Sequence, residues 1–552
     1  MTADHLKKKY VLVIGLLLIL SLYVAATRVY QVDEAQNIYE SWLMGTGRSG
    51  HYDLYAPIYL FALQFVTRLG SSAEAMYLSA RLVWVATFWS ILVLIARCTG
   101  SSWKEERFWK ALVIAGFTAP IWTYGLEVRH DGPALILMLA IWLLVNPRKA
   151  LWRYGHLLAG SLLAVLFFCS SKHILYVAPL FLLVLFVPHP LDSTSRSRRM
   201  LHTGLGLLGG LVLFVTLHLA EGSLGQVLRE FRALYSGVGG AERFGPWALF
   251  KTVIQQSPLV LLFGALPFLL LGRDSLRGWI RNAWTNGVAE LIFMGSVLLG
   301  VLLNPVPFPY NSLPLAGIAL ATGLPAFLRW LEDQAPRSPG WAIGHGAILF
   351  ALCLPWTVQF ARLLEMDNGR QVELMNLAER FTGPGDRVFD AAGLVPGRDS
   401  LQPTWFVHLG NAQALQSDPA RKIETLVRAN PPAVLIPTYR MSYLDADAQS
   451  FLEGHYFPLA EDFWVLGKSQ PAPGGEWECL LSGHYWVGVG QGGASIDGQP
   501  METGAHDFVK GSHSISAPAG SGATILWLGP NLSAPPSLGK GSPGVFPIPI
   551  QM

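Results

Sequence analysis

The sequence Val32-Asp33-Glu34-Ala35 places two adjacent carboxylates just after the long apolar run of residues 10–26. Ionisable groups beside hydrocarbon are costly, and they persist mainly where they line a cavity or take part in chemistry. A second interpretation is that Asp33 and Glu34 are ordinary solvated loop charges. The two interpretations differ in whether other reactive side chains share this place at the membrane surface.

The composition indicates a polytopic membrane protein. Of the 552 residues, 51% are hydrophobic and only 14% are charged, which lies outside the usual balance of soluble domains. The net charge of +3 is small, and the basic residues lie in short loops, so no nucleic-acid partner is expected. The four cysteines are far apart and suggest neither a disulfide framework nor a metal site.

The N-terminal segment is interpreted as an uncleaved membrane anchor. Three lysines at positions 7–9 precede the first apolar run, as in a signal peptide. The sequence Arg28-Val29-Tyr30-Gln31 lacks a small-residue cleavage pattern, however, and many further apolar runs follow.

Twelve apolar runs are candidates for membrane helices, although several fall short of the roughly 20 residues that a span needs. They are residues 10–26, 56–69, 77–96, 109–125, 132–145, 156–170, 173–187, 203–220, 252–271, 287–303, 312–330 and 341–358. The loops at 97–110, 146–153, 188–200 and 272–284 are all basic, and the positive-inside rule places them in the cytoplasm with the N-terminus.

The short run 56–69 decides the topology. If it crossed the membrane, all four basic loops would face outward. We therefore predict that it is a juxtamembrane or re-entrant helix, which leaves about eleven spans. Asp33-Glu34, the stretch 127–131, the connection near Lys172 and the loop 304–311 then share the outer face.

The chain is predicted to have three parts. Residues 1–360 form the membrane domain. Residues 361–470 alternate between predicted helices, at 374–381 and 422–428, and predicted strands, at 386–390 and 433–437, with a possible hairpin at 451–466; this pattern is typical of a small α/β domain. Residues 471–475 read as a linker, and 471–552 as a small β-rich, sandwich-like domain with a tail. No internal repeat is evident.

The outer face carries the groups that a lipid-linked transfer reaction needs. Asp33 or Glu34 can act as a base, because partial desolvation raises a carboxyl pKa toward the working range. Arg129 and Lys172 can hold a phosphate, although Arg129 could equally pair with Asp131, and Lys172 could be an interfacial residue. His51, Asp53 and His130 are weaker binding candidates, and Tyr310 could be an interfacial aromatic.

These residues resemble the GT-C fold glycosyltransferases, in particular enzymes related to protein O-mannosyltransferases and lipid A aminoarabinose transferase. The resemblance covers roughly residues 10–330. It rests on six features in one order: Asp33-Glu34, Ala56-Pro57-Ile58-Tyr59, Arg81-Leu82, Arg129-x-Asp131, Ser171-Lys172-His173 and Pro309-Tyr310-x-x-Leu313-Pro314. The sequence departs from the family pattern around Tyr52–Pro57, where the expected His and paired prolines are not intact.

The resemblance implies inverting transfer of a sugar from a polyprenyl-phosphate donor to a lipid, glycan or protein acceptor, on the outer face of the inner membrane. Asp33 is then the general base, and Glu34 orients the acceptor or supports the site. Arg129 and Lys172 contact the donor phosphate, with Arg81 and Asp131 behind them. Metal dependence stays open, because the two carboxylates could also bind a divalent cation.

Two alternatives remain beside the transferase. A transporter or flippase would also bury charges, but transporters usually place them near the midplane and show repeats. A membrane scaffold would not explain the gathering of reactive groups on one side. The sequence does not reveal the sugar, the acceptor, the oligomeric state or the role of residues 471–552.

Overall fold

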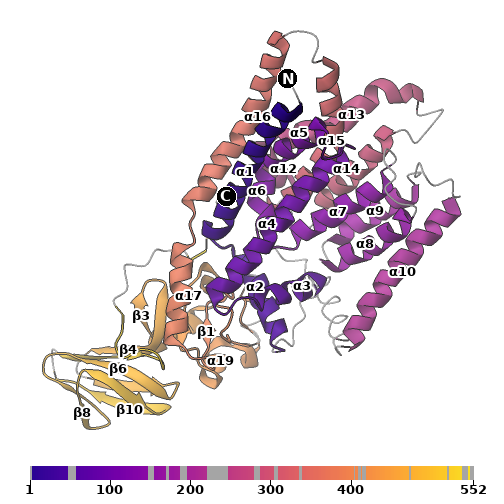
Figure 1. Ribbon diagram of the computed structural model, residues 1–552. Helices are drawn as coiled ribbons and strands as arrows, with labels where there is room; N and C mark the ends of the chain where they lie inside the picture. Colours follow the sequence, from indigo (N-terminus) through magenta and orange to yellow (C-terminus); the bar gives the residue numbers. More distant parts are fainter. Residues whose placement is uncertain are drawn as a thin grey trace. The chain divides into compact units, whose positions relative to one another are not determined.

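A computed structural model describes residues 3–47, 57–146, 154–169, 173–186, 196–220, 225, 246–278, 286–303, 309–334, 339–402, 404–407, 412, 418–471, 474–518, 521–536 and 545–546. The chain forms two compact units (Figure 1). The helical unit comprises Met1–Arg28, Thr46–Val66 and Ser79–Met366. The mixed unit comprises Val29–Gly45, Thr67–Leu78 and Asp367–Met552.

The helical unit is arranged around one buried helix, α15 (Ser312–Gln334). In its apolar window 94% of the residues are buried, against 17% for α10 (Arg196–Ala220). The helices that contact α15 are α5 (Glu106–Gly116), α6 (Ala119–Gly125), α7 (Asp131–Val145), α13 (Pro258–Gly278) and α14 (Asn286–Leu303). The remaining helices are α1 (Ala3–Thr27), α3 (Pro57–Thr67), α4 (Ala73–Cys98), α8 (Gly155–Cys169), α9 (Ile174–Phe186), α12 (Pro246–Gln256) and α16 (Pro339–Glu365).

Helices α8 and α10 run side by side at very short range (Figure 1). A Cβ atom on Gly160 would lie 2.2 Å from the carbonyl oxygen of Thr203, and one on Gly206 would lie 2.0 Å from that of Leu157. Only glycine permits such backbone contact, which is how membrane helices commonly pack.

Two of the predicted single helices are broken in the structure. The run 252–271 is divided between α12 and α13, which meet at an angle of 106° beside Pro258. The run 109–125 is divided between α5 and α6, just before Pro120. In both cases a proline at the start of the second helix lacks the N–H that would continue the first.

The number of spans stays a prediction. Among the residues that the structure describes, four helices are long and apolar enough to cross a membrane, or five if α12 and α13 count as one bent span. The short run at 56–69 forms α3, whose 11 residues are fewer than the roughly 20 that a span needs, and its juxtamembrane or re-entrant position stays a prediction.

The mixed unit begins with α2 (Val32–Gly45), and most of it follows α17 (Gly369–Phe381). Its larger sheet has the order β1 (Val388–Phe389), β2 (Val434–Leu435), β4 (Phe463–Pro471), β11 (Gly522–Trp527), β6 (Gly483–Val489) and β9 (Gly504–Phe508), while β3 (Tyr456–Ala460) also pairs with β4. Strands β1 and β2 are parallel, and the other pairs are antiparallel. The predicted alternation of helices and strands is found, with α19 (Ile423–Ala429) as the second predicted helix. The hairpin expected at 451–466 begins later, as β3 and β4, because residues up to His455 belong to a further helix, α20 (Ala446–His455).

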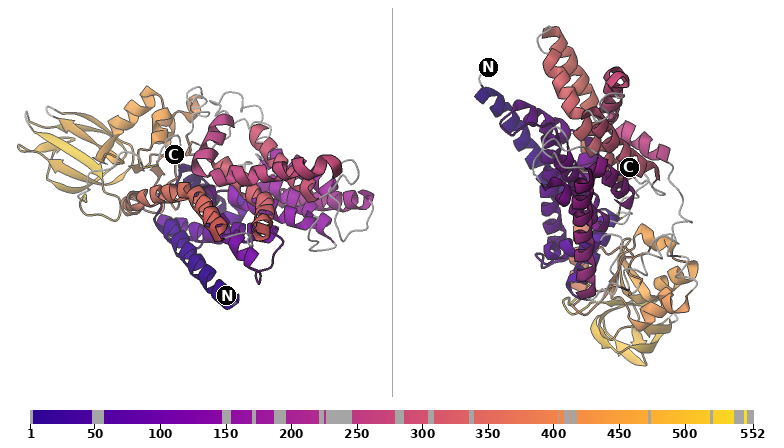
Figure 2. Two further views of the ribbon diagram at one scale, coloured as in Figure 1. Left: turned by 90° about the horizontal axis from the view of Figure 1, so that it is seen from above. Right: turned by 90° about the vertical axis from the view of Figure 1, so that its right-hand side faces the viewer.

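The long strand β4 joins the α/β part to the β-rich part. Its residues Trp464 and Val465 pair with β2, and residues 467–471 pair with β11. The predicted boundary at 471 therefore falls at the end of a strand that belongs to a sheet shared by both parts. The second sheet, β5 (Gly474–Cys479), β10 (Gly511–Ser516), β7 (Ala494–Ile496) and β8 (Gln499–Met501), completes the β-rich part, which is drawn in yellow in Figure 2.

Candidate functional site

Asp33 and Glu34 lie in the first turn of α2, and their environments differ. The side chain of Glu34 is fully buried, and its Oε2 accepts a hydrogen bond of 2.9 Å from the backbone N–H of Gln31. A glutamate at the third helical position often reaches back in this way to satisfy a donor at the helix start. Asp33 is only half-buried.

The segment before α2 is fastened by one glutamine of α17. Gln371 Oε1 accepts a hydrogen bond from the N–H of Tyr30 at 2.6 Å, and Gln371 Nε2 donates to the carbonyl of the same residue at 3.0 Å. The ring of Tyr30 also contacts that of Tyr77, with centroids 4.2 Å apart. These contacts fix the position from which α2 starts.

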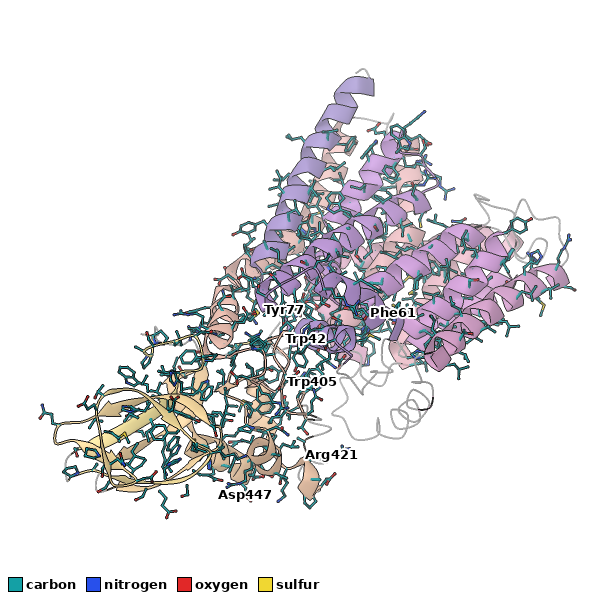
Figure 3. The ribbon with its side chains drawn as sticks, turned by 60° about the horizontal axis from the view of Figure 1, so that its bottom comes forward. Trp42, Phe61, Tyr77, Trp405, Arg421 and Asp447 are labelled. Carbon is teal, nitrogen blue, oxygen red and sulfur yellow. The ribbon has the colours of Figure 1, made fainter. Side chains whose placement is uncertain are left out.

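Helix α2 packs against the loop that follows β1. Tyr39 lies in a buried aromatic cluster with Leu43 and Trp405, next to Trp42 and Phe406; Trp42 and Trp405 are labelled in Figure 3. The phenol of Tyr39 donates to the carbonyl of Arg398 at 3.1 Å. A Cβ atom on Gly393 would lie 2.7 Å from Tyr39, so helix and loop are in direct contact.

The loop after β1 is organised by Asp390. Its two carboxylate oxygens accept hydrogen bonds from the N–H groups of residues 392, 393 and 394, at 2.5–2.7 Å. Burial raises the pKa of the Asp390 carboxyl, although these three bonds stabilise its charged form. Thr438, which follows β2, donates to the carbonyl of Asp390 at 2.7 Å and joins the two strand ends.

Tyr439 and Arg440 follow at the same edge of the sheet. Burial raises the pKa of the Tyr439 phenol, and the negative charge of Asp33 adds to this rise, while Arg440 offsets part of it. The guanidinium of Arg440 lies 4.1 Å from the ring centre of Phe406 and donates to the carbonyl of Val407 at 2.6 Å. The structure thus packs α2, which carries Asp33, against the α/β part through Tyr39, which the sequence did not suggest.

In the helical unit, charged side chains gather around the turn between α6 and α7, with one residue from the end of α1 and one from the start of α9. We call Arg28, Glu127, Arg129, His130, Asp131 and His173 the turn cluster; all six are at most 5% exposed. Arg28 forms an ion pair with Glu127 and donates to the carbonyl of Thr123 at 2.6 Å. Arg129 Nε donates to Asp131 Oδ2 at 3.1 Å. Buried charges of this kind persist only when they are paired and hydrogen-bonded.

Asp131 is shared between several partners. Its Oδ1 lies 3.8 Å from His130 Nε2 and 3.9 Å from His173 Nε2, and the two imidazole rings are 5.7 Å apart. Tyr59 of α3 packs its ring edge-on against His130 at 5.9 Å. Among the described residues, no group of three His, Cys, Asp or Glu side chains has the arrangement of a metal site.

Aromatic side chains and a further arginine hold the turn cluster in place. The guanidinium carbon of Arg129 lies 3.6 Å from the ring centre of Tyr310, a short cation–π contact. Trp84 donates to the carbonyl of Arg129 at 3.3 Å. Arg81 donates to the carbonyls of Ala25 and Arg28, so it caps the end of α1.

The turn cluster together with Arg81 carries three guanidinium groups against two carboxylates. These charged groups lie in a buried region, where electrostatic interactions are stronger than in water. Such an arrangement favours a negatively charged group.

The structure brings some predicted residues together and leaves others aside. Arg129, His130, Asp131 and Tyr310 meet in the turn cluster or touch it, and Arg81 joins it through Arg28. His51, Asp53 and Lys172 lie outside the described residues. Reasoning from sequence missed Arg28, Glu127 and His173 as members, although a charge at the end of an apolar run, such as Arg28, is itself a signal.

No family model matches the sequence, and no curated protein matches it. Solved structures, however, share its fold. ArnT from Cupriavidus metallidurans bound to undecaprenyl phosphate has a TM-score of 0.55 at 11% identity, covering 83% of this chain and 97% of that one. The apo form of that protein gives 0.53 at 11% identity, over 83% and 98%.

The oligosaccharyltransferase of Archaeoglobus fulgidus in its apo form gives a weaker likeness, with a TM-score of 0.48 at 12% identity over 81% of this chain and 72% of that one. At the identity of ArnT a likeness shows the fold alone. The chain therefore has the GT-C fold that its sequence motifs implied, with a strand-rich C-terminal region.

Proposed function

We propose that this chain is an integral membrane glycosyltransferase, which moves a sugar from a polyprenyl-phosphate donor to a lipid, glycan or protein acceptor. The observation that carries this proposal is the buried gathering of guanidinium groups in and beside the turn cluster, within a GT-C fold. The guanidinium groups would bind the anionic phosphate of such a donor, and the apolar helices would accommodate its long polyprenyl chain.

Asp33 acts as the general base. It removes the proton from an acceptor hydroxyl, whose oxygen forms a bond to the anomeric carbon of the donor sugar. The bond from that carbon to the phosphate oxygen breaks on the opposite face, which inverts the configuration, and polyprenyl phosphate leaves with the electron pair. Glu34 supports this step from the start of α2, where its carboxylate is held by the backbone of Gln31.

Arg129 stabilises the phosphate charge that develops on the leaving group, with Lys172 as a second cation. Preorganised donors contribute most where charge appears in the transition state. Tyr310 and Asp131 hold the Arg129 guanidinium in one orientation. Arg81 acts through Arg28, and His51, Asp53 and His130 are assigned to substrate binding.

The sidedness of the reaction follows from the basic loops. We place the N-terminus in the cytoplasm, and the mixed unit, with the α/β part and the β-rich part, on the outer face of the inner membrane. The donor then reaches the site through the bilayer, without a nucleotide-sugar site.

The experiment is turnover by purified protein in lipid nanodiscs, with a panel of radiolabelled polyprenyl-phosphate sugars and a membrane extract as acceptor. Asp33→Asn should lower the rate by at least about 100-fold, because a positioned base contributes on this scale. Glu40→Gln is the matched control on the same helix and should stay within about twofold of wild type. A folded wild-type protein that used no donor, or an Asp33→Asn variant with the wild-type rate, would refute the proposal.

A further inference from the structure

The segment that leads into α2 is held through its backbone by one side chain of α17. Gln371 accepts a hydrogen bond from the N–H of Tyr30 at 2.6 Å and donates one to the carbonyl of Tyr30 at 3.0 Å. Two bonds to one residue fix the direction of the chain as well as its position, because both bonds need good alignment. Glutamine suits this task, since its amide carries an acceptor and two donors at one end of the side chain.

The second donor hydrogen of Gln371 binds a distant stretch of the chain. Gln371 Nε2 donates to the carbonyl of Val545 at 2.7 Å. Tyr30, Gln371 and Val545 are each at most 3% exposed. A buried polar group that lost its partner here would cost free energy, so the amide is held in the orientation that satisfies all three bonds. We call the Gln371 amide, with its bonds to Tyr30 and Val545, the amide clamp.

The bonded stretch continues from Tyr30 into the first turn of α2. The N–H of Gln31 donates to Glu34 Oε2 at 2.9 Å, and the carbonyl of Gln31 accepts a helical bond from the N–H of Ala35 at 3.0 Å. Asp33 lies inside this stretch, three residues after Tyr30. A change in the direction of the chain at Tyr30 would therefore be carried to Asp33.

The far half of α2 is held by other contacts. Tyr39 lies in the buried cluster with Leu43 and Trp405, and its phenol donates to the carbonyl of Arg398 at 3.1 Å. At a rise of about 1.5 Å per residue, Tyr39 lies about 9 Å along the helix from Asp33. Loss of the amide clamp should therefore leave α2 folded and docked at Tyr39, but it should loosen the turn that carries Asp33.

We propose that Gln371 is a positioning residue for the transfer reaction, which holds Asp33 in place through Tyr30 and is itself oriented by the carbonyl of Val545. The inference rests on the proposed function, because it assigns the amide clamp to the proposed base. A base displaced by about 1 Å loses much of its effect on the rate, whereas donor binding is assigned to the turn cluster. A loosened clamp should therefore lower kcat and leave KM for the donor unchanged.

The kinetic test compares Gln371→Met with Gln449→Met in the full-length protein in nanodiscs, with the labelled donor that the wild type uses. Methionine is unbranched and flexible and fills a similar space, but it removes the amide acceptor and donors. Gln449 of α20 is the matched control, because its Nε2 also donates to a backbone carbonyl, that of Leu444, at 2.8 Å. Gln371→Met should lower kcat about 10- to 100-fold with donor KM within about twofold, and Gln449→Met should keep both within about twofold.

Amide hydrogen exchange measures the clamp without reference to activity. Exchange in peptides that cover residues 30–36 should be at least about fivefold faster in Gln371→Met than in wild type, because the bonds that hold this segment are lost. Exchange in peptides that cover residues 39–43 should match wild type, because the aromatic cluster still holds that half of the helix.

Each outcome has a distinct meaning. A wild type that transfers from no donor overturns the proposed function and the inference together. An active wild type with an unchanged kcat in Gln371→Met overturns the inference alone. Unchanged exchange at residues 30–36 shows that the amide clamp does not hold this segment, which also overturns the inference. Equally faster exchange at residues 39–43, or a donor KM that rises as much as kcat falls, would assign Gln371 a general structural role and overturn the inference.

Discussion

Replacing Gly393 by alanine should loosen the packing of α2 against the mixed unit. Gly393 has a φ of +80°, which costs an L-residue about 1–2 kcal/mol. The added Cβ would also lie 2.7 Å from Tyr39 and 2.9 Å from Trp405. Overpacking of this kind costs about 1–3 kcal/mol, so we expect a total loss of about 2–5 kcal/mol in the free energy of unfolding.

Gly498→Ala separates the two contributions. Gly498 has a similar φ of +77°, but a Cβ added there would meet nothing within 4 Å. This variant should lose only the backbone contribution, about 1–2 kcal/mol. Because Asp33 is carried on α2, Gly393→Ala should also slow transfer by about 10- to 100-fold. A displacement of a catalytic group by about 1 Å has effects of this size.

The assay is denaturant unfolding in detergent, followed by tryptophan fluorescence, beside turnover with the preferred donor. Trp405 and Trp42 lie in the affected cluster and are two of the 19 tryptophans of the chain, so the signal follows unfolding of the whole protein and includes this cluster. Equal losses of stability for the two glycine variants would refute the close contact between α2 and the loop after β1. A destabilised Gly393→Ala protein with normal turnover would refute the link between α2 and the chemistry.

Two further predictions concern charge. Arg129→Lys should weaken donor use by about 10- to 100-fold in kcat/KM, because lysine keeps the charge but loses the planar contact with Tyr310 and the bond to Asp131; an unchanged kcat/KM would contradict this role. His513 lies in the β-rich part, where its Nδ1 faces Asp497 at 2.7 Å and its Nε2 faces the carbonyl of Val509 at 2.8 Å. Burial alone would lower the pKa of His513, but these hydrogen bonds raise the pKa above its ordinary value. The protonated His513 therefore stabilises the folded protein fully at low pH, and this stabilisation is lost as pH rises through the raised pKa. The hydrogen bond from His513 lowers the pKa of Asp497, whose own contribution is lost as pH falls through that lowered value. Wild type should therefore exceed His513→Gln in Tm by about 2 °C near pH 6 and by less at pH 9, and a gap that widened with pH would contradict the pairing.

The sequence predicted the features that depend on local signals. The short helix α3 and the elements α17, β1, α19 and β2 follow from apolar patterning, run length and charge, whereas α20 was not predicted. The breaks before Pro120 and Pro258 were missed, although each proline was a visible signal. The apolar composition of each run favoured a single continuous helix over a break at the proline, because composition alone does not reveal a bend within a membrane segment.

The contacts of the candidate sites could not be read from the sequence, because they join distant positions. Arg28 and Glu127 are 99 residues apart, and Tyr39 bonds to a residue 359 positions later. Periodicity describes only one face of one helix, so it could not show that α2 belongs with the mixed unit.

The shared strand β4 sets the order in which the protein can finish folding during synthesis. Residues 467–471 need β11, which ends at Trp527, and the indole of Trp527 donates to the carbonyl of Phe381 at 2.9 Å. Gln371, which holds Tyr30, also donates to the carbonyl of Val545 at 2.7 Å. The segment leading to α2 is therefore held by a glutamine that also bonds Val545, and this set of contacts is complete only after residue 545 has been synthesised. A protein cut at residue 471 would keep every candidate residue named above, but it would expose the edge of β4 to other chains, and we expect it to aggregate.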